Sequence, residues 1–209
     1  MKLIPNSIVS MAIAVAPVIC STARVQAAPA FDCSKAGHEI EELICQNSEL
    51  AGKDRKLAAV YKQALSELSD VTDGAAAATH NLKVFQRGWV KGRNDCWKSP
   101  DKVRCTHDSY DMRIAELQAR YFLVEAAPPV FYECENNPAN EIVASFISTD
   151  LPGVRLERGD TVKVGLLVQT GSGSKYIADH GTSFWIKGDE ALVSWPEGND
   201  FKCQVRKTE

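Results

Sequence analysis

The spacing of apolar residues changes at one point in this chain, and that change constrains the fold more than any other feature. Before the segment 125–129, apolar residues recur every three or four positions, as on one face of an amphipathic helix. After it they alternate with polar residues, as in β-strands. The pair Pro128-Pro129 marks the junction. We therefore predict an α + β chain of two domains, helical at 28–124 and β at 130–209, with a linker between them.

The helical domain is expected to contain one short helix and three longer ones. The short helix covers about 38–45. The next begins with Ser48 as its N-cap and stops at Asp73-Gly74, and the last two cover about 75–93 and 106–123. The apolar residues expected to face the core are Leu50, Leu57, Tyr61, Leu65 and Leu68 in the second helix, Leu82, Phe85, Trp89 and Val90 in the third, and Tyr110, Ile114, Leu117 and Tyr121 in the fourth.

The second half contains about eight short segments rich in β-branched and aromatic residues, with turn residues between them. Such spacing, without any helical period, predicts a small antiparallel barrel or sandwich. The expected strands are 130–135, 142–148, 153–157, 161–168, 174–178, 182–187, 191–195 and 201–206.

Seven cysteines, an odd number, would leave one thiol unpaired. The segment 1–27 offers an explanation, because a basic start at Lys2, an apolar stretch and small residues ending at Ala27 are typical of a secretory signal peptide. Cleavage there would remove Cys20 and leave six cysteines in an exported protein, where disulfides form. In the alternative, a lipoprotein signal, Cys20 would be acylated, although the three residues before it do not fit such a signal.

The six remaining cysteines divide between the two halves. Two lie in the first and last expected strands, where a disulfide would tie the ends of the β domain together. The other four lie in the helical half and allow three pairings, of which we favour the local one. The favoured disulfides are Cys33–Cys45, Cys96–Cys105 and Cys134–Cys203.

Composition and motifs argue against several classes of function. After cleavage the chain would hold 22 Lys and Arg against 27 Asp and Glu. This net charge of −5 does not suggest a protein that binds nucleic acid, because such proteins usually carry an excess of basic residues. No later segment has the ~18 apolar residues of a membrane-spanning helix. The four histidines are scattered and no CxxC is present, so neither a metal nor a cofactor is expected. The sequence from Gly171 is not a nucleophile elbow, because Lys175 occupies the last glycine position, and we expect no enzyme.

In an up-and-down β domain, successive hairpin loops alternate between the two ends of the sheet. The loops 170–173 and 187–189 therefore lie at the same end. The first carries Ser172 between two glycines, and the second begins with Lys187. The two-residue period of a strand also places Lys187 on the same face as Trp185.

The residues around these loops resemble a known family. The run Ser172-Gly173-Ser174-Lys175-Tyr176, followed by 184–191 with the sequence FWIKGDEA, is similar to the signature of the membrane-bound and periplasmic inhibitors of c-type lysozyme (MliC/PliC). The resemblance covers roughly 130–209. It implies a small antiparallel β-barrel that inserts a loop into the lysozyme cleft. It also implies that Ser172 and Lys187 contact the catalytic carboxylates, with Gly173, Tyr176 and Gly188 belonging to the same lysozyme-binding motif.

The helical half is similar to the N-terminal domain of LprI-type proteins, which are also linked to lysozyme inhibition. No binding residue is implied for this half, where Trp89 and Arg93 are expected to be structural. The matching residues, over about 31–122, are Cys33, Ile44-Cys45, Leu50, Asp54, Leu57, Tyr61, Leu65, Gln86-x-x-Trp89-x-x-x-Arg93-x-x-Cys96 and Cys105-x4-Tyr110.

These observations predict a periplasmic or secreted, non-catalytic inhibitor whose partner is c-type lysozyme. The alternative is a periplasmic binding module in which the helical domain recognises peptidoglycan or an envelope protein.

Overall fold

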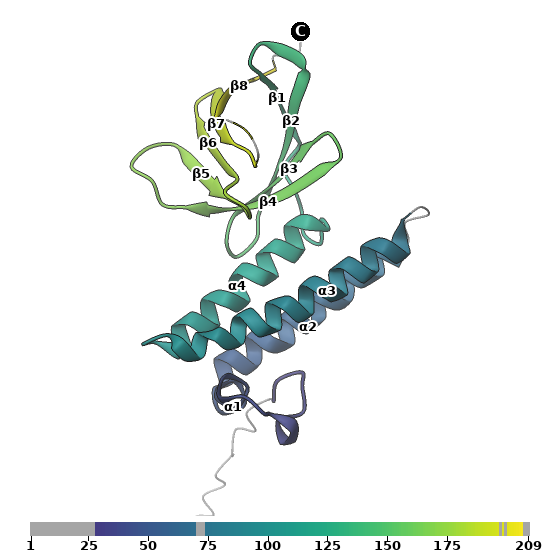
Figure 1. Ribbon diagram of the computed structural model, residues 1–209, viewed down its shortest axis with the longest axis vertical. Helices are drawn as coiled ribbons and strands as arrows, with labels where there is room; N and C mark the ends of the chain where they lie inside the picture. The colour runs from purple at the N-terminus through teal and green to yellow at the C-terminus, as the bar shows by residue number, and fades with distance from the viewer. Residues whose placement is uncertain (1–27, 70–73, 197, 199, 207–209) are drawn as a thin grey trace, which may run out of the picture.

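The chain folds into a helical half followed by a β-barrel, and the two are stacked end to end (Figure 1). The predicted signal peptide with Cys20, and the predicted helix stop at Asp73, lie outside the described residues. The computed structural model describes residues 28–69, 74–196, 198 and 200–206.

Four α-helices and two short 3-10 turns make up the helical half, as the apolar spacing predicted. Their bounds are Cys33–Lys35 (η1), Glu39–Gln46 (α1), Ser48–Ser69 (α2), Ala75–Asn94 (α3), Asp95–Lys98 (η2) and Lys102–Arg120 (α4).

Two helix starts differ from the prediction, and in both cases a side-chain cap explains the difference. The side chain of Asn47, not Ser48, accepts hydrogen bonds from the backbone N–H groups of the first turn of α2, at 3.0 and 3.1 Å. Helix α4 begins at Lys102 because Asp101 accepts a hydrogen bond from the N–H of Arg104 at 2.9 Å. None of the first three residues of α4 is buried, so the apolar spacing of the core-facing residues placed the start four residues too late.

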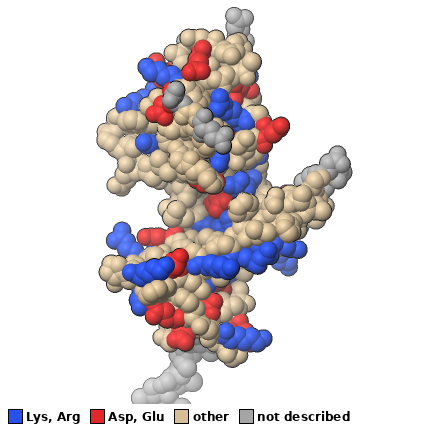
Figure 2. Space-filling model, in the orientation of Figure 1, with Lys and Arg blue, Asp and Glu red and all other residues tan. Residues whose placement is uncertain are grey.

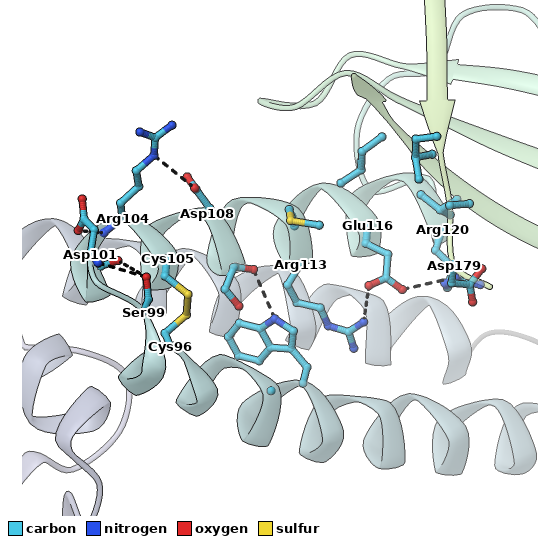
Figure 3. A pocket seen from close by; sticks show the side chains of 18 residues that line it. Cys96, Ser99, Asp101, Arg104, Cys105, Asp108, Arg113, Glu116, Arg120 and Asp179 are labelled. Carbon is cyan, nitrogen blue, oxygen red and sulfur yellow. Dashed lines mark hydrogen bonds and ion pairs between the residues drawn. A yellow bond between two sulfur atoms is a disulfide. The ribbon is translucent and has the colours of Figure 1, made fainter. Parts of the chain in front are cut away.

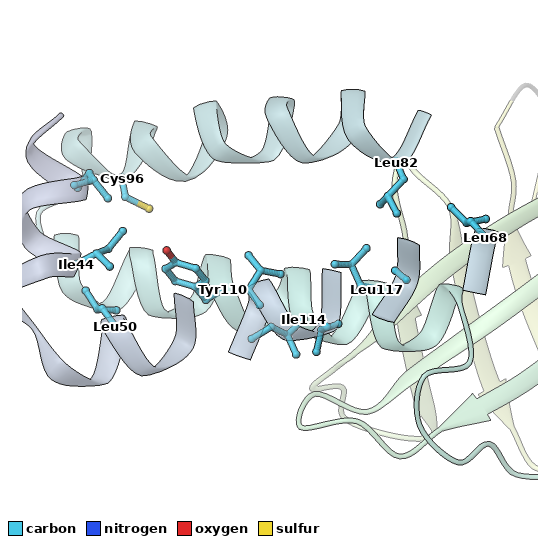
Figure 4. Packing of buried hydrophobic residues seen from close by; sticks show 12 residues of the cluster. Ile44, Leu50, Leu68, Leu82, Cys96, Tyr110, Ile114 and Leu117 are labelled. Atoms are coloured by element: carbon cyan, nitrogen blue, oxygen red, sulfur yellow. The ribbon is translucent and has the colours of Figure 1, made fainter. Parts of the chain in front are cut away.

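The core of the helical half is formed by residues of all four α-helices, and Tyr110 of α4 is its largest fully buried side chain (Figure 4). Arg93 donates to the Tyr110 hydroxyl, which in turn donates to Asp54, both at 2.8 Å. Arg93 also lies over the Trp89 ring. Burial raises the pKa of Tyr110.

The expected inward position of Phe85 is wrong: its side chain is 67% exposed, since α3 buries the side that carries Leu82 and Arg93.

The β half is a closed barrel in which each strand pairs antiparallel with the next and β1 pairs with β8. The prediction of a barrel is confirmed. Its eight strands are Val130–Cys134 (β1), Asn137–Ile147 (β2), Gly153–Arg158 (β3), Thr161–Val168 (β4), Ser174–Ile177 (β5), Ser183–Lys187 (β6), Glu190–Ser194 (β7) and Phe201–Val205 (β8).

Three disulfides form in the pairing that the sequence favoured. Two are local staples of the helical half, and the third joins β1 to β8, whose cysteines face each other in the strand register. That third bond closes the barrel where its first and last strands meet. The pairs are Cys33–Cys45, Cys96–Cys105 and Cys134–Cys203.

The two halves meet where the end of α4 packs against β3 and β4. A small apolar cluster fills the contact, formed by Ala119 of α4 with Ile147 and Val164 of the barrel. Lys56 of α2 pairs with Asp150 of the barrel, and this hydrogen bond holds the pKa of Asp150 below its usual value. Within the described residues, no helix is long and apolar enough to cross a bilayer.

Candidate functional site

The β4–β5 hairpin ends in a glycine-rich loop that carries Ser172. The hydroxyl of Thr170 is within hydrogen-bond distance of the carbonyl oxygens of Ser172, at 3.1 Å, and Gly173, at 2.9 Å, and so folds the loop back on itself. Gly173 has a φ of 69°, a left-handed conformation that side chains with a Cβ rarely adopt. The Ser172 side chain is exposed, and its hydroxyl has no hydrogen-bond partner among the described residues.

The β6–β7 hairpin lies at the same end of the barrel and carries Lys187. Lys187 pairs with Glu190 across a two-residue turn, and Gly188 opens that turn with a φ of 61°. The Lys187 side chain is exposed and makes no ion pair with another described residue. Its charge is therefore not neutralised by a neighbouring carboxylate.

The two hairpins touch, and their contact depends on the absence of a side chain at Gly173. A Cβ built on Gly173 would lie 2.2 Å from the carbonyl oxygen of Ile186 and 2.9 Å from Cγ of Lys187. The Trp185 indole N–H donates to the carbonyl oxygen of Ser172 at 3.0 Å, which ties the first loop to the strand that carries Lys187. Ser172 and Lys187 are thus held together by backbone and ring contacts.

Trp185 also arranges two lysines around its ring. The ammonium nitrogen of Lys187 lies 3.9 Å from the ring centroid, and that of Lys175 lies 5.4 Å from it. Such cation–π contacts stabilise a charge without neutralising it. The result is a barrel end with two ammonium groups and a free serine hydroxyl. These groups can donate hydrogen bonds to anionic oxygens.

The five predicted binding residues divide into four at this barrel end and one in the core. Ser172, Gly173, Lys187 and Gly188 come together as described above. Tyr176 is only 8% exposed; its ring contacts Phe146 inside the barrel, and burial raises the pKa of its hydroxyl. It therefore supports the strand below the loop and does not lie at the surface.

Sequence reasoning did not assign a role to Trp185 or Lys175 at this site. The signal was present, because the strand period places Trp185 on the face of Lys187, and Lys175 pairs directly with Trp185 across β5 and β6. Only the register between the two strands, which a single sequence does not reveal, shows that the indole lies between the two lysines.

Away from this barrel end, a hollow of about 860 Å³ is lined by α3, α4 and the outer face of the barrel (Figure 3). Its charged side chains pair with one another: Glu116 accepts from Arg113 at 2.7 Å and from Arg120 at 3.4 Å. No cluster of metal-ligating side chains occurs there or elsewhere in the described part of the chain. We interpret this hollow as the seam between the two halves.

Comparison with known families agrees with the predicted resemblance in both halves. Residues 132–202 match the family described as membrane-bound lysozyme-inhibitor of c-type lysozyme. Residues 33–117 match the family described as lysozyme inhibitor LprI. Both resemblances are confirmed at the positions where the sequence predicted them. Two inhibitor families in one chain support a lysozyme-inhibitor role and are consistent with a protein that is not an enzyme.

Relatives of known name align with both halves of the chain. The proteins named lipoprotein LprI from Mycobacterium bovis and Mycobacterium tuberculosis are each 24% identical to it over 187 residues, an alignment that covers 88% of this chain and 88% of theirs. The protein therefore joins a helical half that resembles the LprI lysozyme inhibitors to a barrel that resembles the membrane-bound inhibitors of c-type lysozyme.

Proposed function

We propose that this chain is an exported inhibitor of c-type lysozyme that inserts the Ser172 and Lys187 end of its barrel into the active-site cleft of the enzyme. The observation that supports this most is the contact between the two hairpins. Gly173 packs against the backbone of Ile186, and the Trp185 indole N–H binds the Ser172 carbonyl oxygen. A serine hydroxyl and an ammonium group are thereby presented side by side.

The chemistry of the target suits these two groups. Lysozyme is the type case of a retaining glycosidase, whose two carboxyl groups lie about 5 Å apart, one protonated and one ionised. An ammonium group brought into that cleft donates a charge-assisted hydrogen bond to the ionised carboxylate. A serine hydroxyl can donate to one carboxyl group and accept from the other. We assign the first role to Lys187 and the second to Ser172.

Preorganisation supports tight binding by this end of the barrel. Ordering a long side chain on binding costs about 0.5–1.5 kcal/mol. The contact of Lys187 with the Trp185 ring reduces that cost, because it restricts the side chain before lysozyme arrives. The glycines on both sides of Ser172 keep the loop narrow enough for a groove shaped to hold a sugar chain.

Charge also favours the encounter. Residues 127–209 carry 8 Lys and Arg against 12 Asp and Glu, so the barrel is negative overall. A cationic lysozyme is attracted to such a domain at long range. Close to the cleft, the two ammonium groups around Trp185 face the carboxylates of the enzyme.

The proposed location is the cell envelope or the medium. The family that matches residues 132–202 is described as membrane-bound, and the mycobacterial relatives are named lipoproteins, which supports export of this chain as well. The expected signal peptide at 1–27 would direct that export, with acylation at Cys20 as the alternative. Labelling with a radioactive fatty acid would separate the two, since only the lipoprotein would retain the label.

Substitution of the two binding residues tests the proposed site. We expect Lys187→Ala to weaken inhibition of a c-type lysozyme by about 2–5 kcal/mol, because the substitution leaves a buried lysozyme carboxylate without its partner. Ser172→Ala should also weaken inhibition, to a smaller extent. Inhibition constants measured by cell-wall lysis provide the readout. Lys62→Ala, which removes an exposed lysine of α2, is the control and should inhibit like wild type. Full inhibition by both barrel variants would contradict the proposed insertion.

A further inference from the structure

Helix α3 carries a row of basic side chains and not a single acidic one. Among its 20 residues are four Lys and Arg but no Asp or Glu. Arg93 is buried, whereas Lys83, Arg87 and Lys91 are exposed and four residues apart. Residues at that spacing lie along one side of a helix, and the row is about 12 Å long at 1.5 Å per residue. Figure 2 shows the basic side chains along this helix.

No acidic neighbour compensates this row. Lys83, Arg87 and Lys91 form no ion pair or hydrogen bond with any other described residue. Several basic side chains elsewhere in the helical half are paired, such as Lys53 with an aspartate of α4 and Lys102 with a glutamate of α1. Like charges four residues apart destabilise a helix. The unpaired row therefore lowers the stability of α3. A binding role for the row would explain why this cost is tolerated.

Exposed apolar side chains accompany the basic row. Val84 is 41% exposed and lies beside Lys91 around the helix axis. Phe85, at 67%, lies about 100° further round, so it is next to Val84 but well away from the basic row. Helices that lie in the surface of a bilayer combine these two features, with Lys and Arg at the polar headgroups and apolar side chains directed toward the acyl chains.

We propose that the exposed side of α3, with the basic row Lys83, Arg87 and Lys91 along one edge and Val84 and Phe85 next to that row, binds the surface of an anionic lipid bilayer. Charge complementarity and the exposed apolar pair together favour a bilayer over a soluble polyanion, which would leave Val84 and Phe85 in water. The inference goes beyond lysozyme inhibition. In Figure 1, α4 lies between α3 and the barrel, so the two surfaces belong to different parts of the molecule and can be tested separately.

The test is co-sedimentation of the chain from residue 28 onward with phosphatidylglycerol-containing vesicles and with pure phosphatidylcholine vesicles. We expect binding to the anionic vesicles at low salt and its loss at high salt, because the Debye length falls from about 30 Å at 0.01 M to about 3 Å at 1 M. The triple variant Lys83→Gln, Arg87→Gln, Lys91→Gln should bind on the order of 100-fold more weakly, since each basic residue strengthens binding roughly five-fold.

A second triple variant removes the same net charge from paired sites of the helical half. Its three substitutions are Lys35→Gln, Lys98→Gln and Lys102→Gln, each at a residue paired with a carboxylate. It should keep most of the vesicle binding, and Phe85→Ala should lose part of it at low salt. All variants should still inhibit lysozyme if the barrel is the inhibitor, and circular dichroism checks that their helices are folded.

Three results would overturn the inference: no binding to anionic vesicles at low salt, equal losses in the two triple variants, or binding to a soluble polyanion such as polyphosphate without binding to vesicles. None of these outcomes bears on the barrel, so failure here is distinguishable from failure of the proposed inhibitor function.

Discussion

At the scale of single residues, Gly173 decides whether the candidate site can form. Ser172 and Lys187 are 15 positions apart in the sequence, and they meet because nothing at position 173 keeps the hairpins separate. The glycine both adopts a left-handed φ and approaches the carbonyl of Ile186. Gly171, two positions earlier, has neither constraint, since a Cβ there would meet nothing within 4 Å. The two glycines therefore provide a matched pair.

We expect Gly173→Ala to weaken lysozyme inhibition about tenfold or more, whereas Gly171→Ala should leave it unchanged. The left-handed conformation alone costs a residue with a Cβ about 1–2 kcal/mol, and a tenfold change corresponds to about 1.4 kcal/mol. The close contact with Ile186 adds to this cost by displacing the loop. Inhibition constants of both variants, with circular dichroism to confirm folding, provide the check. Equal inhibition by the two variants would show that the hairpin contact is not required.

At the scale of elements, local pattern predicted most of the fold, and the exceptions have identifiable causes. The strand that ends at Ile147 begins at Asn137, five residues earlier than expected, because its first five residues, with the sequence NPANE, are of types that are rare in strands. Phe85 was assigned to the core from its apolar character, although helix geometry places it outside the buried side. The register that brings Trp185 between two lysines depends on pairing between strands, which no local pattern contains.

Helix α4 offers a test at this scale, because its start depends on one cap. We expect Asp101→Ala to lower the free energy of unfolding by about 0.5–2 kcal/mol, since the substitution removes the acceptor for the N–H of Arg104. Asp101→Asn keeps an oxygen acceptor of similar capping strength and should be close to wild type. Urea unfolding followed by circular dichroism measures both. If Asp101→Asn destabilised as much as Asp101→Ala, the charge and not the cap would be responsible.

At the scale of the whole molecule, the disulfides and the seam divide the chain into two units with separate cores. The Cys134–Cys203 bond closes a loop of about 70 residues, which the chain-entropy model values at about 4 kcal/mol. Two local disulfides cross-link the helical half, and α4 joins the two halves through a small apolar contact. Sequence patterns predicted this division, and the matches to two inhibitor families follow it. The candidate binding face of the barrel, by contrast, could be described only once it was known which hairpins touch.

The most direct test of the central claim is the kinetic pattern of lysozyme inhibition by the chain from residue 28 onward. Insertion of Ser172 and Lys187 into the cleft excludes the glycan substrate, so the account predicts competitive inhibition. With a soluble chitin oligosaccharide as substrate, the apparent KM should rise with inhibitor concentration while kcat stays constant. Lys187→Ala should shift that series to higher inhibitor concentrations. A fall in kcat at unchanged KM, or no inhibition by the wild-type chain, would contradict the account.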